Sequence, residues 1–548
     1  MKRLYTSFML VLVSLAATSQ QAFFKATSYR GAFAPAPEAM WTDTWCNWDP
    51  QNTAYGSSTV TVSSSITANT TWTAGNVYLL QGQIYVKNNS TLTIEPGTLI
   101  LGDVETDGSG LFITKGSKLV AVGTASQPIV FTSNQPVGSR NLGDWGGIIL
   151  LGKATNNNAG GVGNIEGIAP TADTEFGGGT SPDDNDNSGV LQYVRIEFGG
   201  YVYAPNKEIN GLTFGSVGRG TTIDHIQCSF VNDDAFEWFG GSVNCKNLVA
   251  YRCLDDDFDT DNGFNGKVQF CLSVRDPEIA DNPTVSTSEG FESDNNPAGD
   301  GATPITAAVF SNVTEIGPLR GDVTTAGTVA VGFRRAARVR RNSQLKIFNS
   351  VLMDYPKGIM IDGTACETNA SDATIGFKNN LLAGNTAGNV CELTSGSSFD
   401  IHSWFALNNN DSLTSTTGIL QTPYSFLTPD YRPAAASVAL SGADFSDAAF
   451  GGTFVSVQSV ASTFSDAVVF PNPAAETATL YFQTESPGSV TVQVVDLAGR
   501  AVINEVKNVP ATGKNSITLN TQALNNGLFF IILSSDEARQ SIRLAISK

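Results

Sequence analysis

The sequence predicts an all-β protein, built as a right-handed parallel β-helix followed by a small Ig-like β-sandwich. Only 15% of the 548 residues are charged, 54 are Gly, and short runs of Val, Ile, Leu and Phe are separated by turns rich in Asn, Thr, Ser and Gly. These runs recur at intervals of roughly 20 to 25 residues, too short for the blades of a β-propeller at about 40. Because so short a strand cannot bury its apolar face alone, we expect successive coils to stack.

The chain begins with the pattern of a signal peptide, which we place at residues 1–19. Lys2 and Arg3 precede an apolar run at 8–17, and the small residues Ala17-Thr18-Ser19 supply a cleavage site. No later stretch approaches the roughly 20 apolar residues of a transmembrane helix, so we expect no transmembrane segment.

An aromatic-rich segment, residues 20–75, comes next and contains Phe33, Trp41, Trp45 and Trp48. We interpret it as an N-terminal cap, because large aromatic side chains can cover the open end of a first coil. A surface on which a ligand stacks is the alternative.

Residues 76–434 form the predicted β-helix body. Segments such as 222–230, 247–253 and 267–272 alternate apolar with polar residues at period two, which turns one face of each strand inward. The seven cysteines of an exported chain permit disulfides, and Cys366 and Cys391 bracket one repeat length, although an odd count leaves a thiol over.

A compositional break at residues 435–465 reads as a linker, and residues 466–548 form a separate β domain with six or seven strand-length segments. This domain resembles the type A C-terminal sorting domain of cargo of the type IX secretion system. The resemblance rests on Pro471-Asn472-Pro473, Asp496 to Arg500, the Leu524 to Phe529 turn and the terminal Leu544 to Lys548, with Phe529 standing where the family usually has Tyr. It implies transfer across the outer membrane by the type IX machinery, removal of the domain, and release or attachment to surface lipopolysaccharide.

The body is similar to exported bacterial proteins of the parallel β-helix (pectin-lyase-like) type. The matching segments are Leu92 to Thr98, Gly143 to Gly152 and Asp233 to Gly241. This resemblance implies a fold and no activity.

The formal net charge of −19 argues against a nucleic-acid partner and favours divalent cations. If Phe230 lies beside Cys253 and Leu272, the pairs Asp233-Asp234, Asp256-Asp257 and Arg275-Asp276 stack about 5 Å apart, and a cation or a shared proton should relieve the repulsion. We therefore predict a calcium site, with a solvated or internally paired acidic turn as the alternative. The loop is not an EF-hand, since Gly263 comes one place late. The predicted ligands are Asp233, Asp234, Asp256, Asp257, Asp259 and Asp261.

A catalytic interpretation is the alternative function. Asp233-Asp234 resembles the Asp-Asp step of polygalacturonases, but their His-Gly and Arg-Ile-Lys motifs are absent downstream. A lyase would need calcium and a basic residue, for which Arg252 and Arg275 are candidates. His225 we interpret as an outward polar residue of its strand.

The only dense basic patch contains Arg334, Arg335, Arg338, Arg340 and Arg341. Arg binds carboxylate or sulfate bidentately, so an anionic glycan could dock there, although such runs more often pair with nearby Asp and Glu.

Taken together, the sequence predicts a secreted or outer-membrane-attached β-helix that is calcium-stabilised and binds glycan or adheres. The alternative is a polysaccharide lyase or glycoside hydrolase for uronate polymers.

Overall fold

The computed structural model describes residues 23–204, 207–320, 329–386, 388–451, 464–484, 488–495, 501–509, 513–534 and 539–548. The predicted signal peptide and the Asp496 to Arg500 motif lie outside these ranges. The chain divides into two compact units, Met1–Thr453 and Phe454–Lys548.

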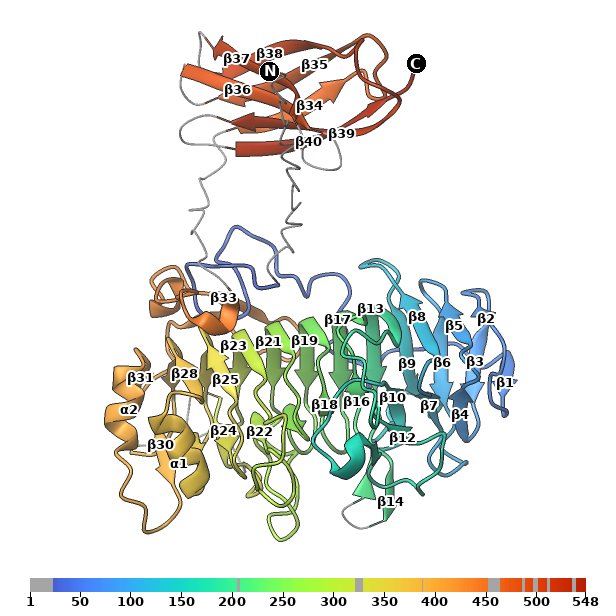
Figure 1. Ribbon diagram of the computed structural model, residues 1–548, viewed down its shortest axis with the longest axis vertical. Coiled ribbons are helices and arrows are strands. Elements are labelled where there is room, and N and C mark those ends of the chain that lie inside the picture. The colour runs from blue at the N-terminus through green and yellow to red at the C-terminus, as the bar shows by residue number, and fades with distance from the viewer. Residues whose placement is uncertain are drawn as a thin grey trace, which may run out of the picture. The chain divides into compact units, whose positions relative to one another are not determined.

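The first unit is a β-helix whose coils contribute strands to two large parallel sheets (Figure 1). We call the ten-stranded one sheet B. Its strands, in spatial order, are β4 (Gln83–Val86), β7 (Gly110–Ile113), β10 (Gly147–Leu151), β16 (Leu212–Val217), β18 (Phe236–Gly241), β20 (Phe258–Asp261), β22 (Phe291–Ser293), β24 (Arg335–Val339), β27 (Lys357–Ile361) and β30 (Cys391–Leu393).

The other sheet, sheet A, has seventeen strands. They are β1 (Val60–Val62), β2 (Thr70–Trp72), β3 (Val77–Leu80), β5 (Thr91–Ile94), β6 (Leu99–Gly102), β8 (Lys118–Val122), β9 (Ile129–Ser133), β13 (Gly189–Glu197), β17 (Thr222–Ser229), β19 (Asn244–Tyr251), β21 (Lys267–Val274), β23 (Val309–Ile316), β25 (Lys346–Phe348), β26 (Val351–Met353), β28 (Gly376–Lys378), β29 (Leu381–Ala383) and β31 (Asp411–Leu413). The parallel pairing throughout both sheets confirms the predicted β-helix.

Short antiparallel pairs and helices decorate the coils. The pairs are β11 (Gly163–Asn164) with β12 (Glu175–Phe176), β14 (Val202–Ala204) with β15 (Lys207–Glu208), and β32 (Leu420–Thr422) with β33 (Asp430–Pro433), and the α-helices are α1 (Thr364–Ser371) and α2 (Ile401–Leu407). Among the described residues, no helix is long and apolar enough to cross a membrane.

The long strands of sheet A turn a corner at one left-handed residue each. The strand pairing places four such residues at one position in successive coils: His225, Asn247, Phe270 and Asn312, with φ of 57°, 55°, 63° and 57°. Asn tolerates this backbone region better than most L residues. At this corner the strand changes direction, so one segment of eight or nine residues forms two sides of the coil.

Alternation along sheet B points aromatic rings into the coil. Phe236 and Phe258 stack with centroids 6.0 Å apart, and Phe258 approaches Phe291 at 5.1 Å. Since successive residues of a strand face opposite sides, the residue after each of these Phe side chains faces outward. This places Glu237, Asp259 and Glu292 on the outer face.

The aromatic-rich N-terminal segment lies along the outer face of sheet A, and not over the open end of the first coil where the cap interpretation places it. The main-chain amides of Lys25 and Asn47 donate to the side-chain oxygens of Gln269 on β21 and Gln227 on β17. The hydroxyl of Tyr55 donates to Glu197 on β13. Residues 60–75 already supply β1 and β2. The aromatic side chains therefore cover the apolar flank of several coils, because that flank, like an open end, needs to be shielded from water.

All seven cysteines lie in the described part of the chain and are free, so the predicted Cys366–Cys391 disulfide is not formed.

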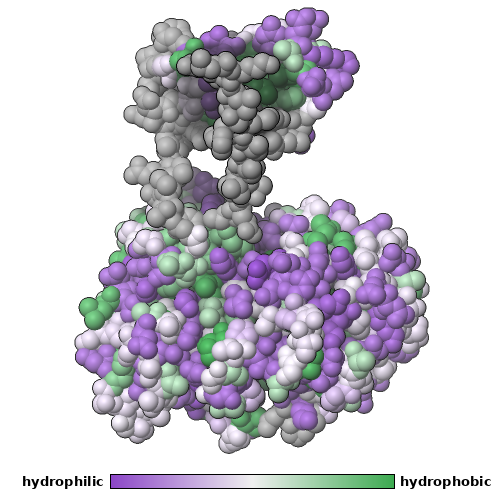
Figure 2. Space-filling view, viewed as in Figure 1, coloured by the Kyte–Doolittle hydropathy of each residue, from purple (hydrophilic) through white to green (hydrophobic). Residues whose placement is uncertain are grey.

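The face of the molecule in Figure 2 is mostly hydrophilic, with apolar residues scattered over it.

The second unit is a small antiparallel sandwich, as predicted. One sheet has the order β34 (Phe464–Phe470), β35 (Thr477–Thr484), β38 (Gly513–Asn520), and the other β37 (Ala501–Val509), β36 (Gly488–Val495), β39 (Gly527–Ser534), β40 (Arg539–Ile546). Phe529 is buried in its core, where a ring packs well without the Tyr hydroxyl.

Candidate functional site

A ladder of carboxylates crosses the outer face of sheet B. Strand pairing sets Glu237 of β18 opposite Asp259 of β20, Asp259 opposite Glu292 of β22, and Glu292 opposite Arg338 of β24. Neighbouring strands of a sheet are about 4.8 Å apart, so these side chains crowd one another.

The turns that lead into β18 and β20 bring further acids to the same place. The main-chain amide of Asp256 donates to Asp234 Oδ1 at 2.9 Å, and the amide of Glu289 donates to Asp256 Oδ1 at 2.6 Å. These bonds hold successive turns in contact across coils.

The register of these turns differs from the predicted one. Ser229 pairs with Tyr251, so Phe230 lies opposite Arg252 and not opposite Cys253. Asp233 and Asp234 therefore meet Asp255 and Asp256, one residue earlier than expected.

Three groups of carboxylates could each hold a metal ion, because the ligand oxygens within each group lie within 4.8 Å of one another. We call them triad 1 (Asp233, Asp234, Asp255), triad 2 (Asp234, Glu237, Asp259) and triad 3 (Asp256, Asp259, Glu292). Triads 1 and 2 share Asp234, and triads 2 and 3 share Asp259. Two ionised carboxylates at that separation repel by about 3 kcal/mol at an effective dielectric constant of 20.

Two of these side chains have an oxygen that is buried without a hydrogen-bond partner. They are Asp255 and Asp259, in each case at Oδ1. Leaving a buried acceptor unpaired costs about 1 to 3 kcal/mol. A cation at the triads would satisfy both.

Burial raises the pKa of every acid in the three triads, and the neighbouring carboxylates raise it further. The pKa of Asp233 rises to about 8, with Glu208 as the largest neighbouring contribution. That of Glu292 rises to about 7, because burial outweighs the opposing effect of Arg340. The remaining triad acids shift in the same direction.

All the acids of triads 1 and 2 line a cavity of about 430 Å³, whereas triad 3 contributes only Asp259 to its lining. Its charged lining consists of Glu166, Glu208, Asp233, Asp234, Glu237, Asp255, Asp259, Asp281, Arg340 and Arg341. Eight carboxylates against two guanidinium groups make it strongly attractive to cations. Hard oxygen ligands in this number suit calcium.

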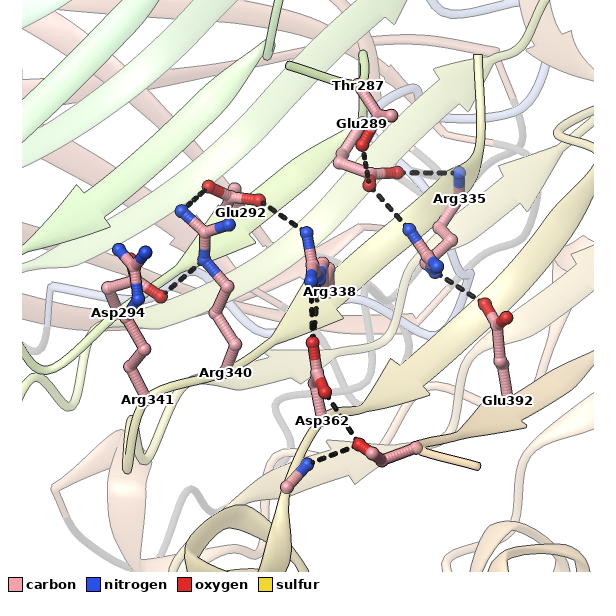
Figure 3. A network of polar contacts seen from close by, with 12 residues as sticks. Thr287, Glu289, Glu292, Asp294, Arg335, Arg338, Arg340, Arg341, Asp362 and Glu392 are labelled. Carbon is pink, nitrogen blue, oxygen red and sulfur yellow. Dashed lines mark hydrogen bonds and ion pairs between the residues drawn. The ribbon is translucent and has the colours of Figure 1, made fainter. Parts of the chain in front are cut away.

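The arginine cluster of β24 is paired with acids, the alternative that the sequence left open (Figure 3). Arg335 contacts Glu289 at 2.8 Å and Glu392 at 2.5 Å, and Arg338 contacts Asp362 at 2.6 Å. Arg334 donates to the main-chain carbonyls of Val331 and Phe333.

Asp257 and Arg275 lie inside the coil, apart from the cavity. Both are fully buried, with Arg275 Nε 2.9 Å from Asp257 Oδ2, and Tyr355 and Ser273 also donate to that oxygen. Burial raises the pKa of Asp257 to about 6 against the opposing effect of Arg275. A side chain with no exposed surface cannot reach a substrate.

The other candidate bases and ligands also lie elsewhere. Arg252 pairs with Asp276 and stacks over Phe230 and Phe426. His225 faces outward as expected, and its ring stacks on Tyr193 at 4.4 Å beneath the N-terminal segment. Asp261 lies near Asp294 and Arg341 rather than in a triad, and burial raises its pKa to about 7.

The structure thus brings together Asp233, Asp234, Asp256 and Asp259 of the predicted ligands, and adds Glu237, Asp255 and Glu292. Two of the additions, Glu237 and Glu292, follow a signal that the sequence carries, whereas Asp255 follows Leu254 in a turn and shows no such signal. Each outward acid comes directly after the inward Phe that begins a strand of sheet B, as in Phe236-Glu237, Phe258-Asp259 and Phe291-Glu292.

Comparison with known proteins gives two family matches. Residues 64–419 match the pectate-lyase like beta helix domain, and residues 468–547 match the secretion system C-terminal sorting domain. No curated protein matches the chain.

Three solved structures are similar to parts of it. Dimeric latent PorU from Porphyromonas gingivalis is 19% identical over 15% of this chain, with a TM-score of 0.13, and the match spans only 9% of the PorU chain. The Dettilon tailspike protein is 10% identical, covering 87% of this chain and 83% of its own, with a TM-score of 0.26. Tailspike protein 2 from Escherichia coli O157:H7 bacteriophage CAB120 is 10% identical, covering 86% and 64%, with a TM-score of 0.18.

Proposed function

The chain belongs to the family of pectate-lyase like beta helix domains, and from this premise we propose that its body is a calcium-binding module that holds anionic glycan at the bacterial surface. Its C-terminal sorting domain identifies it as a protein that the type IX secretion system exports, so it is secreted or attached to the outer-membrane surface. The calcium and the glycan are the proposed part.

The observation that carries the proposal is the pair of overlapping triads 1 and 2, with buried unpartnered oxygens on Asp255 and Asp259. Protonation could relieve the repulsion at low pH, but above the raised pKa values the acids ionise and need a counter-charge. Two calcium ions that share Asp234 would supply it and would also satisfy both orphan oxygens.

Anionic glycan is the ligand that fits the remaining features. A calcium ion that keeps an open coordination position can bind the carboxylate of a uronate, because Ca²⁺ coordinates carboxylate oxygens whether they belong to a sugar or to a protein. Arg341, whose side chain is 45% exposed, lines the same cavity and offers further donors. Lipopolysaccharide at the cell surface is one source of such acidic sugars.

The test is calcium titration of the exported chain by calorimetry and thermal melting. We expect binding and stabilisation in the wild type, and their loss at triad 2 in Asp259→Asn. Glu105→Gln, at an exposed acid that belongs to none of the triads and does not line the cavity, is the matched control and should behave as wild type. Uronate polymers should then bind with calcium and not with chelator. A wild type indifferent to calcium would refute the proposal.

A second candidate, a polysaccharide lyase or glycoside hydrolase, is favoured by one observation. Asp233 and Asp234 line the cavity, and a carboxyl with a pKa of about 8 is protonated at neutral pH, as a general acid must be. Incubation with uronate polymers distinguishes the two candidates: unsaturated or reducing products that disappear in Asp233→Asn would establish the enzyme.

A further inference from the structure

Triad 3 differs from the other two in having its own positive charge. Arg340 forms an ion pair with Glu292, and its Nε lies 2.7 Å from Asp294 Oδ1 (Figure 3). Arg338 Nη1 lies farther from Glu292, at 3.5 Å, and is engaged chiefly by Asp362. Within the described ranges, no Lys or Arg forms an ion pair with the five acids of triads 1 and 2.

We propose that Arg340 is a fixed counter-cation that takes the place of a metal ion in triad 3, so that the three triads together bind two calcium ions and not three. This inference rests on the proposed calcium site. It makes Arg340 the residue that sets the number of cations.

The position of Arg340 is fixed by the sheet. Its main-chain amide donates to the carbonyl of Ser293 at 2.9 Å, so the side chain starts directly after β24, next to Asp294 of the neighbouring coil. The side chain is 21% exposed, and Glu292 and Asp294 are 10% and 6% exposed. A guanidinium held between two buried carboxylates cannot leave without abandoning both charges.

The electrostatics keep Arg340 charged and couple it to the shared ligand. Although burial lowers the pKa of Arg340, Glu292 and Asp294 raise it, and Asp259 adds to this effect. Arg340 in turn lowers the otherwise raised pKa of Asp259. Since Asp259 belongs to triads 2 and 3, Arg340 places a fixed positive charge beside the ligand that the two triads share.

A metal ion in triad 3 would have to compete with this guanidinium for Glu292. Ca²⁺ and the guanidinium both require the same carboxylate oxygens, and two positive centres on one carboxylate repel. Removing Arg340 should therefore open a third calcium site made of Asp256, Asp259 and Glu292.

The experiment measures calcium stoichiometry of the exported chain by equilibrium dialysis with metal analysis. We expect two ions per chain in the wild type and three in Arg340→Met. Arg335→Met removes an arginine of β24 that pairs with Glu289 and Glu392, and should leave the number at two. Adding Glu292→Gln to Arg340→Met should return it to two.

Each result has a distinct meaning. A folded Arg340→Met chain with the wild-type number of ions overturns the role of Arg340 and leaves the proposed function intact. One new ion in this variant above a wild type that binds none supports Arg340 and refutes the proposed function, and no binding in either refutes both. If Arg340→Met fails to fold, Glu292→Gln alone still decides: unchanged stoichiometry supports the inference, and loss of one ion overturns it.

Discussion

Replacing Asp259 by Asn should have opposite effects on stability with and without calcium. Asp259 is the acid shared by triads 2 and 3, and its Oδ1 is buried without a partner. Without a cation it adds repulsion, whereas with calcium it is a ligand. Asn keeps the shape and one acceptor oxygen but loses the charge.

The size of each effect follows from the spacing. An ionised pair at 4.8 Å costs about 3 kcal/mol at an effective dielectric constant of 20. Because some of the neighbouring acids are protonated, we expect Asp259→Asn to remove the repulsion of roughly one such pair. Calcium at 1,000 times its Kd stabilises by about 4.1 kcal/mol per site, so loss of one site outweighs the relieved repulsion by about 1 kcal/mol. For a body of this length, 1 kcal/mol corresponds to roughly 1 °C in Tm.

The assay is thermal melting at pH 9, where more of the triad acids are ionised. With chelator, Asp259→Asn should melt about 3 °C above the wild type, and with saturating calcium the order should reverse. The same order in both buffers would refute the reasoning, because it would mean that Asp259 is not a cation ligand. Glu105→Gln should melt with the wild type in both.

Three further predictions concern the solenoid itself. Arg275→Met should destabilise the body by about 3 to 5 kcal/mol in chemical denaturation, because it leaves Asp257 buried and unpaired, and adding Asp257→Asn should restore part of the loss. Glu315 is fully buried and both its oxygens lack partners, and burial, followed by Asp257, raises its pKa well above the ordinary value. Its folded form therefore favours the proton, so stability should be full below about pH 4.5 and fall as pH rises toward the folded pKa, and melts of Glu315→Gln should lack this part of the decline. At the left-handed corner residue Asn379, with φ of 58°, Ala should cost about 1 to 2 kcal/mol and Gly much less, and equal denaturation midpoints for the two variants would contradict the corner's backbone role.

The sequence predicts the architecture well because the period of the apolar runs determines it. Coil spacing and period-two alternation are local properties, so the β-helix and the terminal sandwich follow from them. The position of the Trp45 segment does not follow, since nothing local distinguishes the flank of a solenoid from its end. The free thiols Cys366 and Cys391 show a similar limit: one repeat length brings two residues to neighbouring coils without aligning their side chains.

The candidate site was predicted in composition but not in register. An alignment by apolar residues put Phe230 beside Cys253, whereas pairing puts it beside Arg252, and a slip of one residue sends a side chain to the other face. Asp257 consequently faces the core and meets Arg275, while Asp255 faces the cavity. The spacing between β20 and β22 is longer than one repeat, so a fixed repeat length does not align Glu292 with Asp259.

A stack of coils repeats whatever chemistry occupies one outward position. On sheet B that position reads Glu237, Asp259, Glu292 and then Arg338, so the sign of the ladder changes between β22 and β24. Beyond the change, acids such as Asp362 and Glu392 find arginines within the chain. Before it, Asp234, Glu237 and Asp259 have no such partner among the described residues, and this is the basis of the proposed cation site. Between β22 and β24, therefore, the ladder passes from acids that have no arginine partner to acids that have one. A site that depends on a bound cation should be sought on the unpaired side of this boundary.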